Sequence, residues 1–210
     1  GIVEYAQNAK DGGSSSLGPF ALYPEGVPEG PKQRDLAKVV WDEQRKSWVG
    51  PFIMAGINTR IVRRSNALLD FYYGENFKYK EVSVLRSKWK GQKGLFGLGL
   101  FFLLLKNSLT RSLVRKFVLP SPGQGPSREK IEAGRFKMNI TGNTSIRVEV
   151  EAHRDPGYGA TATMLGESAF CLAKEESLGL HMGVVTPASG MGEALIEALN
   201  QNGVTFKVLK

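Results

Sequence analysis

The stretch DPGYGATATMLGESAF, residues 155–170, places three glycines and two threonines around the expected start of a helix. Such a turn either cradles a phosphate or simply joins a strand to a helix. A P-loop needs a lysine in the motif, and this stretch has none. A dinucleotide fingerprint needs G-x-G-x-x-G, and the third glycine, Gly166, comes four positions too late. We find no intact cofactor fingerprint in the sequence and predict a strand-to-helix turn here.

This interpretation assigns a role to the polar and small residues of the stretch. Asp155, Pro156 and Gly157 break the preceding strand, and the helix starts near Thr161, whose side chain can cap free N–H groups. Small residues let the helix press closely on a sheet; they are Ala160, Ala162, Gly166 and Ala169. The same helix N-terminus can still attract an anionic group of a substrate.

The residues before this turn, GRFKMNITGNTSIRVEVEAH at 134–153, alternate apolar and polar side chains on both sides of Gly142 and Asn143. Strict alternation is typical of strands, and Gly-Asn is typical of a tight turn. We therefore predict a β-hairpin in which Phe136, Met138 and Ile140 face Ile146, Val148 and Val150.

The first half of the chain divides into three parts. Pro, Gly and Ser are dense over residues 11–35, which predicts an irregular connection. WDEQRKSW, residues 41–48, resembles two short strands around a polar turn. Residues 50–74 then run from a buried segment into a helix. On this helix Ile61, Leu68 and Leu69 share an apolar stripe, and Arg60, Arg63 and Arg64 crowd one side.

Composition limits the kinds of site that the chain can carry. About two-fifths of its 210 residues are apolar, enough for a real core. A single cysteine, Cys171, excludes an internal disulfide or a multi-cysteine metal site, and the two histidines lack metal-ligand spacing. The net charge of +8 points to a polyanionic neighbour, either nucleic acid or an anionic membrane.

Most of this charge lies in residues 78–116, where ten basic residues accompany one acid, Glu81. The segment contains GLFGLGLFFLLL, residues 94–105, which as a helix spans only ~18 Å and cannot cross a hydrocarbon core of ~30 Å. An apolar run with basic flanks predicts an in-plane membrane anchor, and a buried helix or an oligomer contact is the alternative. The predicted contacts are Lys93, Leu95, Phe96, Leu98, Leu100, Phe101, Phe102 and Leu103. Nucleic acid is disfavoured because no known binding motif is present.

Four stretches together resemble the C-terminal half of saccharopine dehydrogenase-like oxidoreductases, a group that includes bacterial trans-acting enoyl reductases. They are PFIMAGINTRIVRRSNALL, GQGPSREKIEAGRFKM, DPGYGATATMLGESAFCLA and GVVTPASGMGEALIEALNQNGVTF. The resemblance implies an α+β fold, with a mixed or antiparallel sheet packed against helices. It also implies an N-terminal Rossmann domain that binds NAD(P) in a full-length member. Residues 1–38 would then connect to that missing domain, and 39–210 would form a substrate or dimerisation domain with the apolar-basic segment 88–118.

The resemblance implies a short set of candidate substrate-binding residues. The N-T-R-x-V-R-R-S-N block supplies Asn58, Arg60, Arg63 and Arg64, and arginine suits a carboxylate or phosphate. The G-Y-x-A-T block and the helix after it supply Tyr158, Thr161 and Glu167. The alternative is structural: the arginines pair with acids and hold their helix, and Glu167 is buried with an arginine partner. No catalytic residue is assigned, and His153 is expected to be structural.

Two functions of different class remain open. The first is an oxidoreductase domain acting on a lipid-linked substrate, with no cofactor site in this chain and no turnover by the fragment. The second is a scaffold or accessory subunit of a membrane-associated complex. Either one predicts an intracellular or organellar, membrane-associated protein, without separating mitochondrion, plastid and lipid droplet. The expected partners are a lipid surface or membrane complex, a second copy of the chain, or the Rossmann half.

Overall fold

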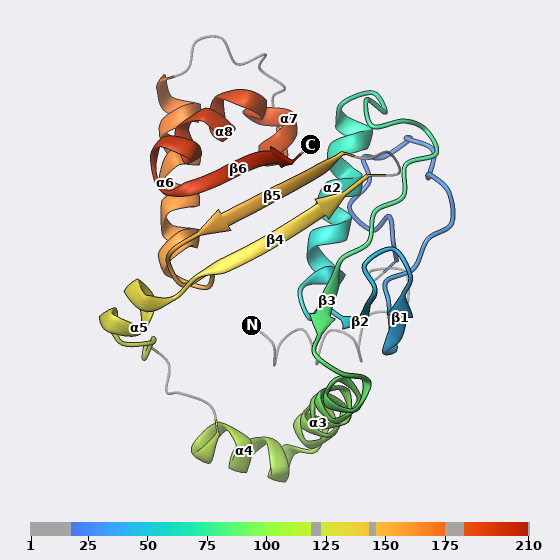
Figure 1. Ribbon diagram of the computed structural model, residues 1–210, viewed down its shortest axis with the longest axis vertical. Helices are drawn as coiled ribbons and strands as arrows, with labels where there is room; N and C mark the ends of the chain where they lie inside the picture. Colours follow the sequence, from blue (N-terminus) through green and yellow to red (C-terminus); the bar gives the residue numbers. More distant parts are fainter. Residues whose placement is uncertain (1–17, 119–122, 143–145, 175–182, 210) are drawn as a thin grey trace. The chain divides into compact units, whose positions relative to one another are not determined.

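The computed structural model describes residues 18–118, 123–142, 146–174 and 183–209, and it divides the chain into two compact units. Unit 1 comprises Gly1–Gly123 and unit 2 comprises Gln124–Lys210. Each unit contains a three-stranded antiparallel sheet together with helices (Figure 1). The α+β class is therefore confirmed, with two small antiparallel sheets.

The sheet of unit 1 consists of β1 (Val40–Asp42), β2 (Ser47–Pro51) and β3 (Val82–Leu85), in that order. Trp41 pairs with Trp48 across β1 and β2, and their rings meet edge to face at 5.5 Å. Asp42 holds the intervening turn, because its Oδ1 accepts the N–H of Arg45 at 2.9 Å. The two short strands around a polar turn are confirmed.

Three helices complete the described part of unit 1: α2 (Ala55–Leu68), α3 (Lys88–Lys106) and α4 (Ser108–Phe117). The first turn of α3 lies against β2 and β3, and Gly91 makes this approach possible. A Cβ at Gly91 would collide with Leu85 Cδ1 and lie 3.0 Å from Val39 Cγ2. Asn107 separates α3 from α4 and caps α4, since its side chain accepts the N–H of Leu109. Only Asn107 lies between the two helices, so α4 follows α3 directly.

The side of α2 that is buried differs from the prediction. The buried residues are Ala55, Thr59, Arg63, Ser65, Asn66 and Ala67, whereas Ile61, Leu68 and Leu69 are only half-buried. The predicted apolar stripe is therefore not the side on which the buried residues lie. The predicted burial of the preceding segment is wrong, because Phe52, Ile53 and Met54 are exposed. Polar loop atoms cover α2, so its polar side chains find partners inside the unit.

Unit 2 begins with α5 (Arg128–Ala133) and the strands β4 (Phe136–Thr141) and β5 (Arg147–Ala152). Three helices follow, α6 (Gly159–Lys174), α7 (Pro187–Gly190) and α8 (Gly192–Gln201), and β6 (Val204–Leu209) closes the sheet beside β5. The predicted hairpin is confirmed, since Met138 pairs with Val150 and Ile140 with Val148. Asn143 of the predicted turn lies outside the described residues.

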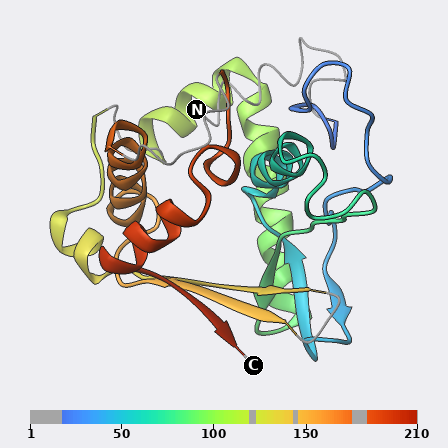
Figure 2. The same cartoon turned by 90° about the horizontal axis from the view of Figure 1, so that it is seen from above.

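The core of unit 2 lies between this sheet and the helices α6 and α8, which sit on the same side of it (Figure 2). Its fully buried members are Val150, Ala152, Ala160, Met191, Leu195, Leu199 and Val204. Of the small residues expected to face the sheet, Ala160 does so. Ala162 and Ala169 are exposed, and a Cβ at Gly166 would meet no neighbour, so the prediction is wrong for these three.

Candidate functional site

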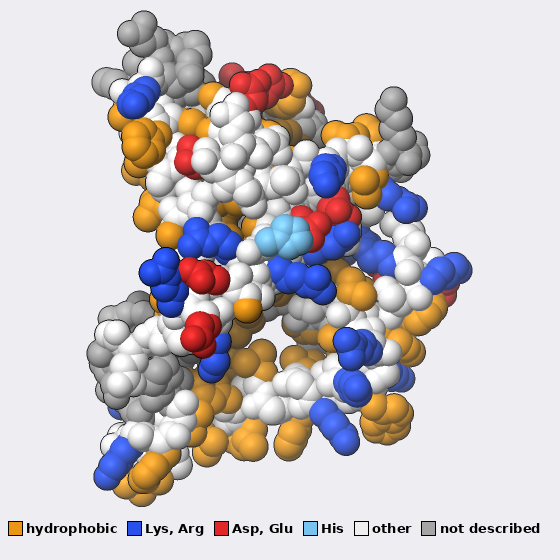
Figure 3. All heavy atoms as spheres, turned by 60° about the vertical axis from the view of Figure 1, so that its left-hand side comes forward, with side chains coloured by type: hydrophobic (Ala, Val, Ile, Leu, Met, Phe, Trp, Pro, Cys, Tyr) orange, Lys and Arg blue, Asp and Glu red, His pale blue; other side chains and the backbone are white. Residues whose placement is uncertain are grey.

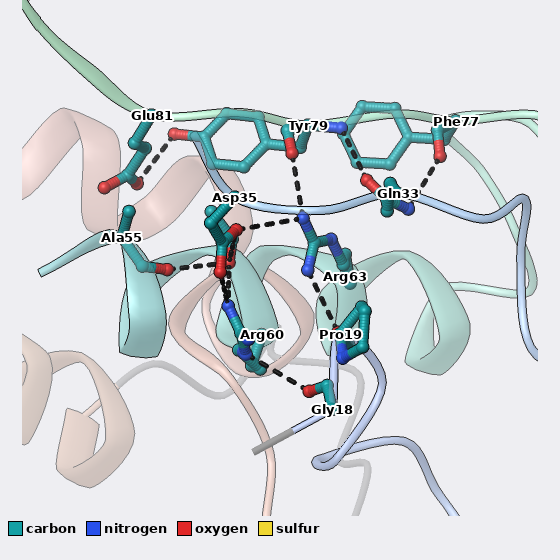
Figure 4. A network of polar contacts seen from close by, with 11 residues as sticks. Gly18, Pro19, Gln33, Asp35, Ala55, Arg60, Arg63, Phe77, Tyr79 and Glu81 are labelled. Carbon is teal, nitrogen blue, oxygen red and sulfur yellow. Dashed lines mark hydrogen bonds and ion pairs between the residues drawn. The ribbon is translucent and has the colours of Figure 1, made fainter. Parts of the chain in front are cut away.

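The buried polar face of α2 gathers around one acid, Asp35 (Figure 4). Asp35 accepts from Thr59 Oγ1 at 3.1 Å and from Arg63 Nη2 at 3.5 Å, and it forms an ion pair with Arg60. We call these four residues the Asp35 network. Arg63 lies beside both Thr59 and Arg60 on the helix surface, because it follows them by four and three residues.

Arg63 is the centre of the Asp35 network, with a side chain only 1% exposed. Its Nη1 donates to the carbonyl of Pro19 at 3.1 Å, and its Nη2 donates to the carbonyl of Tyr79 at 3.0 Å. Its Nε has no partner among the described residues. Burial is the main cause that lowers the pKa of Arg63, and the charge of Asp35 opposes it. Arg63 therefore ties two loops to α2 from inside the unit.

The neighbouring arginines also reach backbone carbonyls of the unit. Arg60 Nε donates to Gly18 O at 3.2 Å, and Arg64 Nη1 donates to Leu22 O at 2.6 Å. Asn66 bonds both ways with the loop after the helix, since its Nδ2 donates to Gly74 O at 3.0 Å and its Oδ1 accepts from Tyr73 N at 2.8 Å. Arg60 and Arg63 thus pair with an acid, as the structural alternative predicts, and Arg64 bonds to a loop carbonyl.

Asn58 joins a second acid rather than the Asp35 network. Its Nδ2 donates to Glu81 Oε2 at 2.9 Å, and the phenol of Tyr79 donates to Glu81 Oε1 at 3.0 Å. Burial, followed by the charge of Glu81, raises the pKa of Tyr79 well above its usual range. Sequence reasoning missed Asp35, Tyr79 and Glu81 as partners. The only available signal was the number of arginines on one helix, which implied acids elsewhere.

In unit 2 the start of α6 already holds an anion of the chain itself. Asp155 Oδ2 accepts from Tyr158 N at 2.7 Å, and Asp155 O accepts from Ala160 N at 2.8 Å. A phosphate arriving here would meet a carboxylate, so this turn does not fit a dinucleotide pyrophosphate. Thr161 Oγ1 donates to Pro156 O, so its predicted role as the cap is wrong. The Asp155 carboxylate instead accepts the N–H of Tyr158, the residue just before α6.

The other candidates of unit 2 do not converge on one point. Tyr158 is exposed, and Glu167 is half-buried on α6. Within the described ranges Glu167 has no ion pair, so the expected arginine partner is not seen. His153 is exposed, and its Nε2 lies 3.5 Å from Glu151 Oε1. In the part of the chain that is described, no three His, Cys, Asp or Glu side chains gather to hold a metal ion.

The predicted lipid-contact residues fall on two sides of α3. Lys93, Phe96, Leu100 and Leu103 are exposed, with Phe96 at 74% and Leu103 at 60%. Leu95, Leu98, Phe101 and Phe102 are half-buried. None of the helices in the described ranges has the length and apolar character needed to cross a bilayer.

Comparison with known proteins finds relatives in mycobacteria. A protein of Mycobacterium tuberculosis (strain ATCC 25618 / H37Rv), provisionally named a trans-acting enoyl reductase, is 35% identical over 230 aligned residues, covering 100% of this chain and 54% of that protein. Trans-acting enoyl reductases of Mycobacterium ulcerans (strain Agy99) and Mycobacterium bovis (strain BCG / Pasteur 1173P2) are each 38% identical, over 84% and 82% of this chain and 44% and 43% of their own lengths. The chain thus spans about half the length of the curated relatives it matches.

No family model and no solved structure matches the chain. The likeness to trans-acting enoyl reductases agrees with that part of the resemblance, and an enoyl reductase is an oxidoreductase. The wider saccharopine dehydrogenase-like family and the separate Rossmann half stay predictions.

Proposed function

We propose that this chain is the C-terminal portion of a saccharopine dehydrogenase-like, NAD(P)-dependent oxidoreductase that works on a lipid-linked substrate at a membrane or lipid surface. The observation that carries the proposal is the 35% identity to a relative named as an enoyl reductase, over 100% of this chain but only 54% of that relative. Reduction of an enoyl group needs a hydride donor, which in most oxidoreductases is a nicotinamide cofactor.

The cofactor would be held by a Rossmann half in the longer protein. The glycine-rich turn before α6 fits a pyrophosphate poorly, because Asp155 already accepts from the N–H groups of Tyr158 and Ala160 and places a carboxylate there. The 210-residue chain would then supply the substrate or dimerisation side and would not turn over substrate by itself.

A scaffold or accessory subunit of a membrane-associated complex is the second candidate. It is favoured by the internal contacts of the arginine block, because Arg60 and Arg63 donate to Asp35 and to loop carbonyls. Arginines engaged in this way stabilise a binding surface without offering a substrate clamp.

Two measurements separate these candidates. The first is the intact mass of the protein from its native source, which we expect near twice the 23.0 kDa of this chain. The second is titration with NADPH and NADH, followed by nicotinamide fluorescence, on the native-length protein and on the 210-residue chain. We expect binding by the native-length protein alone. A native mass near 23.0 kDa would favour the scaffold, and nucleotide binding by the 210-residue chain would overturn the assignment of the cofactor to a separate half.

A further inference from the structure

We propose that α3 and α4 form an in-plane docking surface for an anionic lipid headgroup layer, with one defined face turned to the lipid. This inference rests on the lipid-surface part of the proposed function and adds the face, the orientation and the headgroup charge. The docking surface comprises the exposed apolar residues Trp89, Phe96, Leu100 and Leu103 of α3 and Leu109, Leu113 and Phe117 of α4.

Helix α3 is apolar on both sides, but only one side is covered by other residues of the unit. Positions 89, 96, 100 and 103 follow the helical repeat and share one side, and all four side chains are exposed. The other side carries Gly91 against the sheet and Leu105, which is buried. A helix that is hydrophobic all round needs an apolar environment on every side. The exposed side of α3 therefore lacks the apolar contacts that such a helix needs.

Helix α4, which follows α3, also exposes apolar side chains. Leu109, Leu113 and Phe117 stand on successive turns, and Leu109 and Phe117 are 72% and 73% exposed. Thr110 Oγ1 donates to Leu104 O and fastens the start of α4 to the end of α3. Hydrophobic side chains gather along the lower edge of Figure 3, at the height of these two helices in Figure 1. An exposed apolar surface of this kind marks a binding site.

The charge of the residues around the docking surface indicates what binds to it. Between Glu81 and Glu129 the sequence has no acidic residue. Exposed cations accompany the apolar side chains; they are Lys88, Lys90, Lys93, Lys106 and Lys116. A second copy docked on this surface would place like charges opposite each other, which is unfavourable. An anionic lipid surface fits both the apolar side chains and the lysines of the docking surface. The lysine stems lie along apolar surface while their ammonium groups reach the lipid phosphates.

The dimensions indicate how the helices lie. At ~1.5 Å per residue, α3 is ~28 Å long and α4 is ~15 Å long. Lys93 stands among the outward apolar residues, so a helix perpendicular to the bilayer would bury its charge. Lying flat, α3 keeps this ammonium at the headgroups while Phe96 and Leu103 enter the apolar boundary.

The test is co-sedimentation of the full 210-residue chain with phosphatidylcholine vesicles, with or without about one-third phosphatidylserine. We expect binding to the anionic vesicles that weakens as salt rises. The double variant Phe96→Ser/Leu103→Ser should weaken it at least about tenfold. Tyr72→Ser/Val84→Ser is the matched control, because both residues are exposed apolar positions of unit 1 outside the docking surface, and it should bind as the parent does.

Charge is tested by Lys90→Gln/Lys93→Gln against Lys32→Gln/Lys38→Gln, four exposed lysines of unit 1 in pairs that remove the same charge. We expect about thirtyfold weaker binding for the first pair only, because each lysine near the surface contributes about 1 kcal/mol and the pair removes two. Circular dichroism should show all variants folded, since every changed residue is exposed.

The outcomes separate the two proposals. If the chain binds neither vesicle, the lipid surface of the proposed function and the docking surface both fail. If it binds anionic vesicles and the Phe96/Leu103 variant binds as tightly as its control, the lipid surface survives and the docking surface is overturned. Binding to neutral vesicles that is as tight as binding to anionic vesicles overturns the proposed preference for anionic headgroups. A dimer in sedimentation velocity that the Phe96/Leu103 variant abolishes assigns this face to a second copy instead.

Discussion

Helices α2 and α3 of unit 1 depart from the usual distribution of side chains in opposite directions. α2 buries a charged side chain, Arg63, at 1% exposure, whereas α3 exposes a large apolar one, Phe96, at 74%. A buried charge and an exposed apolar surface are the two informative exceptions to hydrophobic burial. The buried charge has identified partners in Asp35 and two loop carbonyls. The exposed aromatic side belongs to a surface with no acid nearby in sequence.

The partners of each exceptional side chain decide whether it contributes to folding or to binding. A polar group whose partners lie inside the unit contributes to stability, because its removal leaves those partners unsatisfied. An exposed apolar face is unfavourable in water, and its burial becomes favourable only when another molecule binds to it. Substitutions on α2 should therefore change unfolding, and substitutions on the exposed side of α3 should not.

The largest expected effect is at Arg63. Arg63→Ala removes the donor to Pro19 O and Tyr79 O and should cost about 3–5 kcal/mol of unfolding free energy. Tryptophan fluorescence during urea unfolding measures it selectively, because all three tryptophans lie in unit 1. Arg45→Ala, which breaks an exposed pair with Asp42, should cost less than about 1 kcal/mol. Equal costs for the two variants would contradict the assigned role of Arg63.

A comparison within α3 should give the next largest effect. Leu105 is 3% exposed and Leu103 is 60% exposed, although they are two residues apart. Leu105→Ala should destabilise unit 1 by about 2–5 kcal/mol, because it leaves a cavity, and Leu103→Ala should stay within about 0.5 kcal/mol. The same urea titration applies to both. A large loss at Leu103 would show that the exposed side is covered within the chain.

Two glycines of α3 should respond differently to replacement by alanine. A Cβ at Gly91 would collide with Leu85, whereas one at Gly97 has no neighbour within 4 Å. Gly97→Ala should stabilise the helix by up to about 1 kcal/mol. Gly91→Ala gains the same helix propensity but loses about 1–3 kcal/mol to overpacking, so it should be neutral or destabilising. Thermal unfolding followed by circular dichroism compares the stabilities of the two variants. A Gly91 variant more stable than the Gly97 variant would contradict the close packing of α3 against the sheet at Gly91.

The smallest effect is expected at alkaline pH. Burial and the charge of Glu81 raise the pKa of Tyr79 above that of an ordinary tyrosine, near 10. A raised folded pKa gives stability that is complete below about pH 10 and is lost as pH rises towards the folded value. Absorbance at 295 nm should show a phenol that ionises late, and Tyr79→Phe should remove it. Glu81→Gln should let it ionise at lower pH, and an unchanged titration in both variants would refute this.

The sequence predicted those parts of the fold that depend on local pattern. Alternation around Gly142 predicted the β4–β5 hairpin, and Trp41 to Trp48 predicted the β1–β2 turn, because period-2 patterns need only near neighbours. The resemblance and the charge pattern likewise located the candidate residues of α2 and α3, but not what surrounds them.

The surroundings could not be predicted because they depend on distant segments. Asp35 lies in a Pro- and Gly-rich connection, 25 residues before Arg60, and nothing local pairs the two. The same reason explains why the apolar stripe of Ile61 and Leu68 does not mark the buried side of α2. An apolar count cannot foresee that loops bring carbonyls to that face. At α6 the helix begins at Gly159, before Thr161, so the Thr161 hydroxyl donates to Pro156 O and the Asp155 carboxylate accepts the N–H of Tyr158.

The order of strands in unit 2 also has a consequence for biosynthesis. β5 is the central strand, yet one of its neighbours, β6, is encoded about 50 residues later. At about 5–20 residues per second, β5 leaves the ribosome roughly 3–10 s before β6. During that interval one edge of β5 is open and Val150 lacks part of its cover. Nascent chains of this protein therefore pass through a stage at which a chaperone that binds exposed strands would find its target in β5.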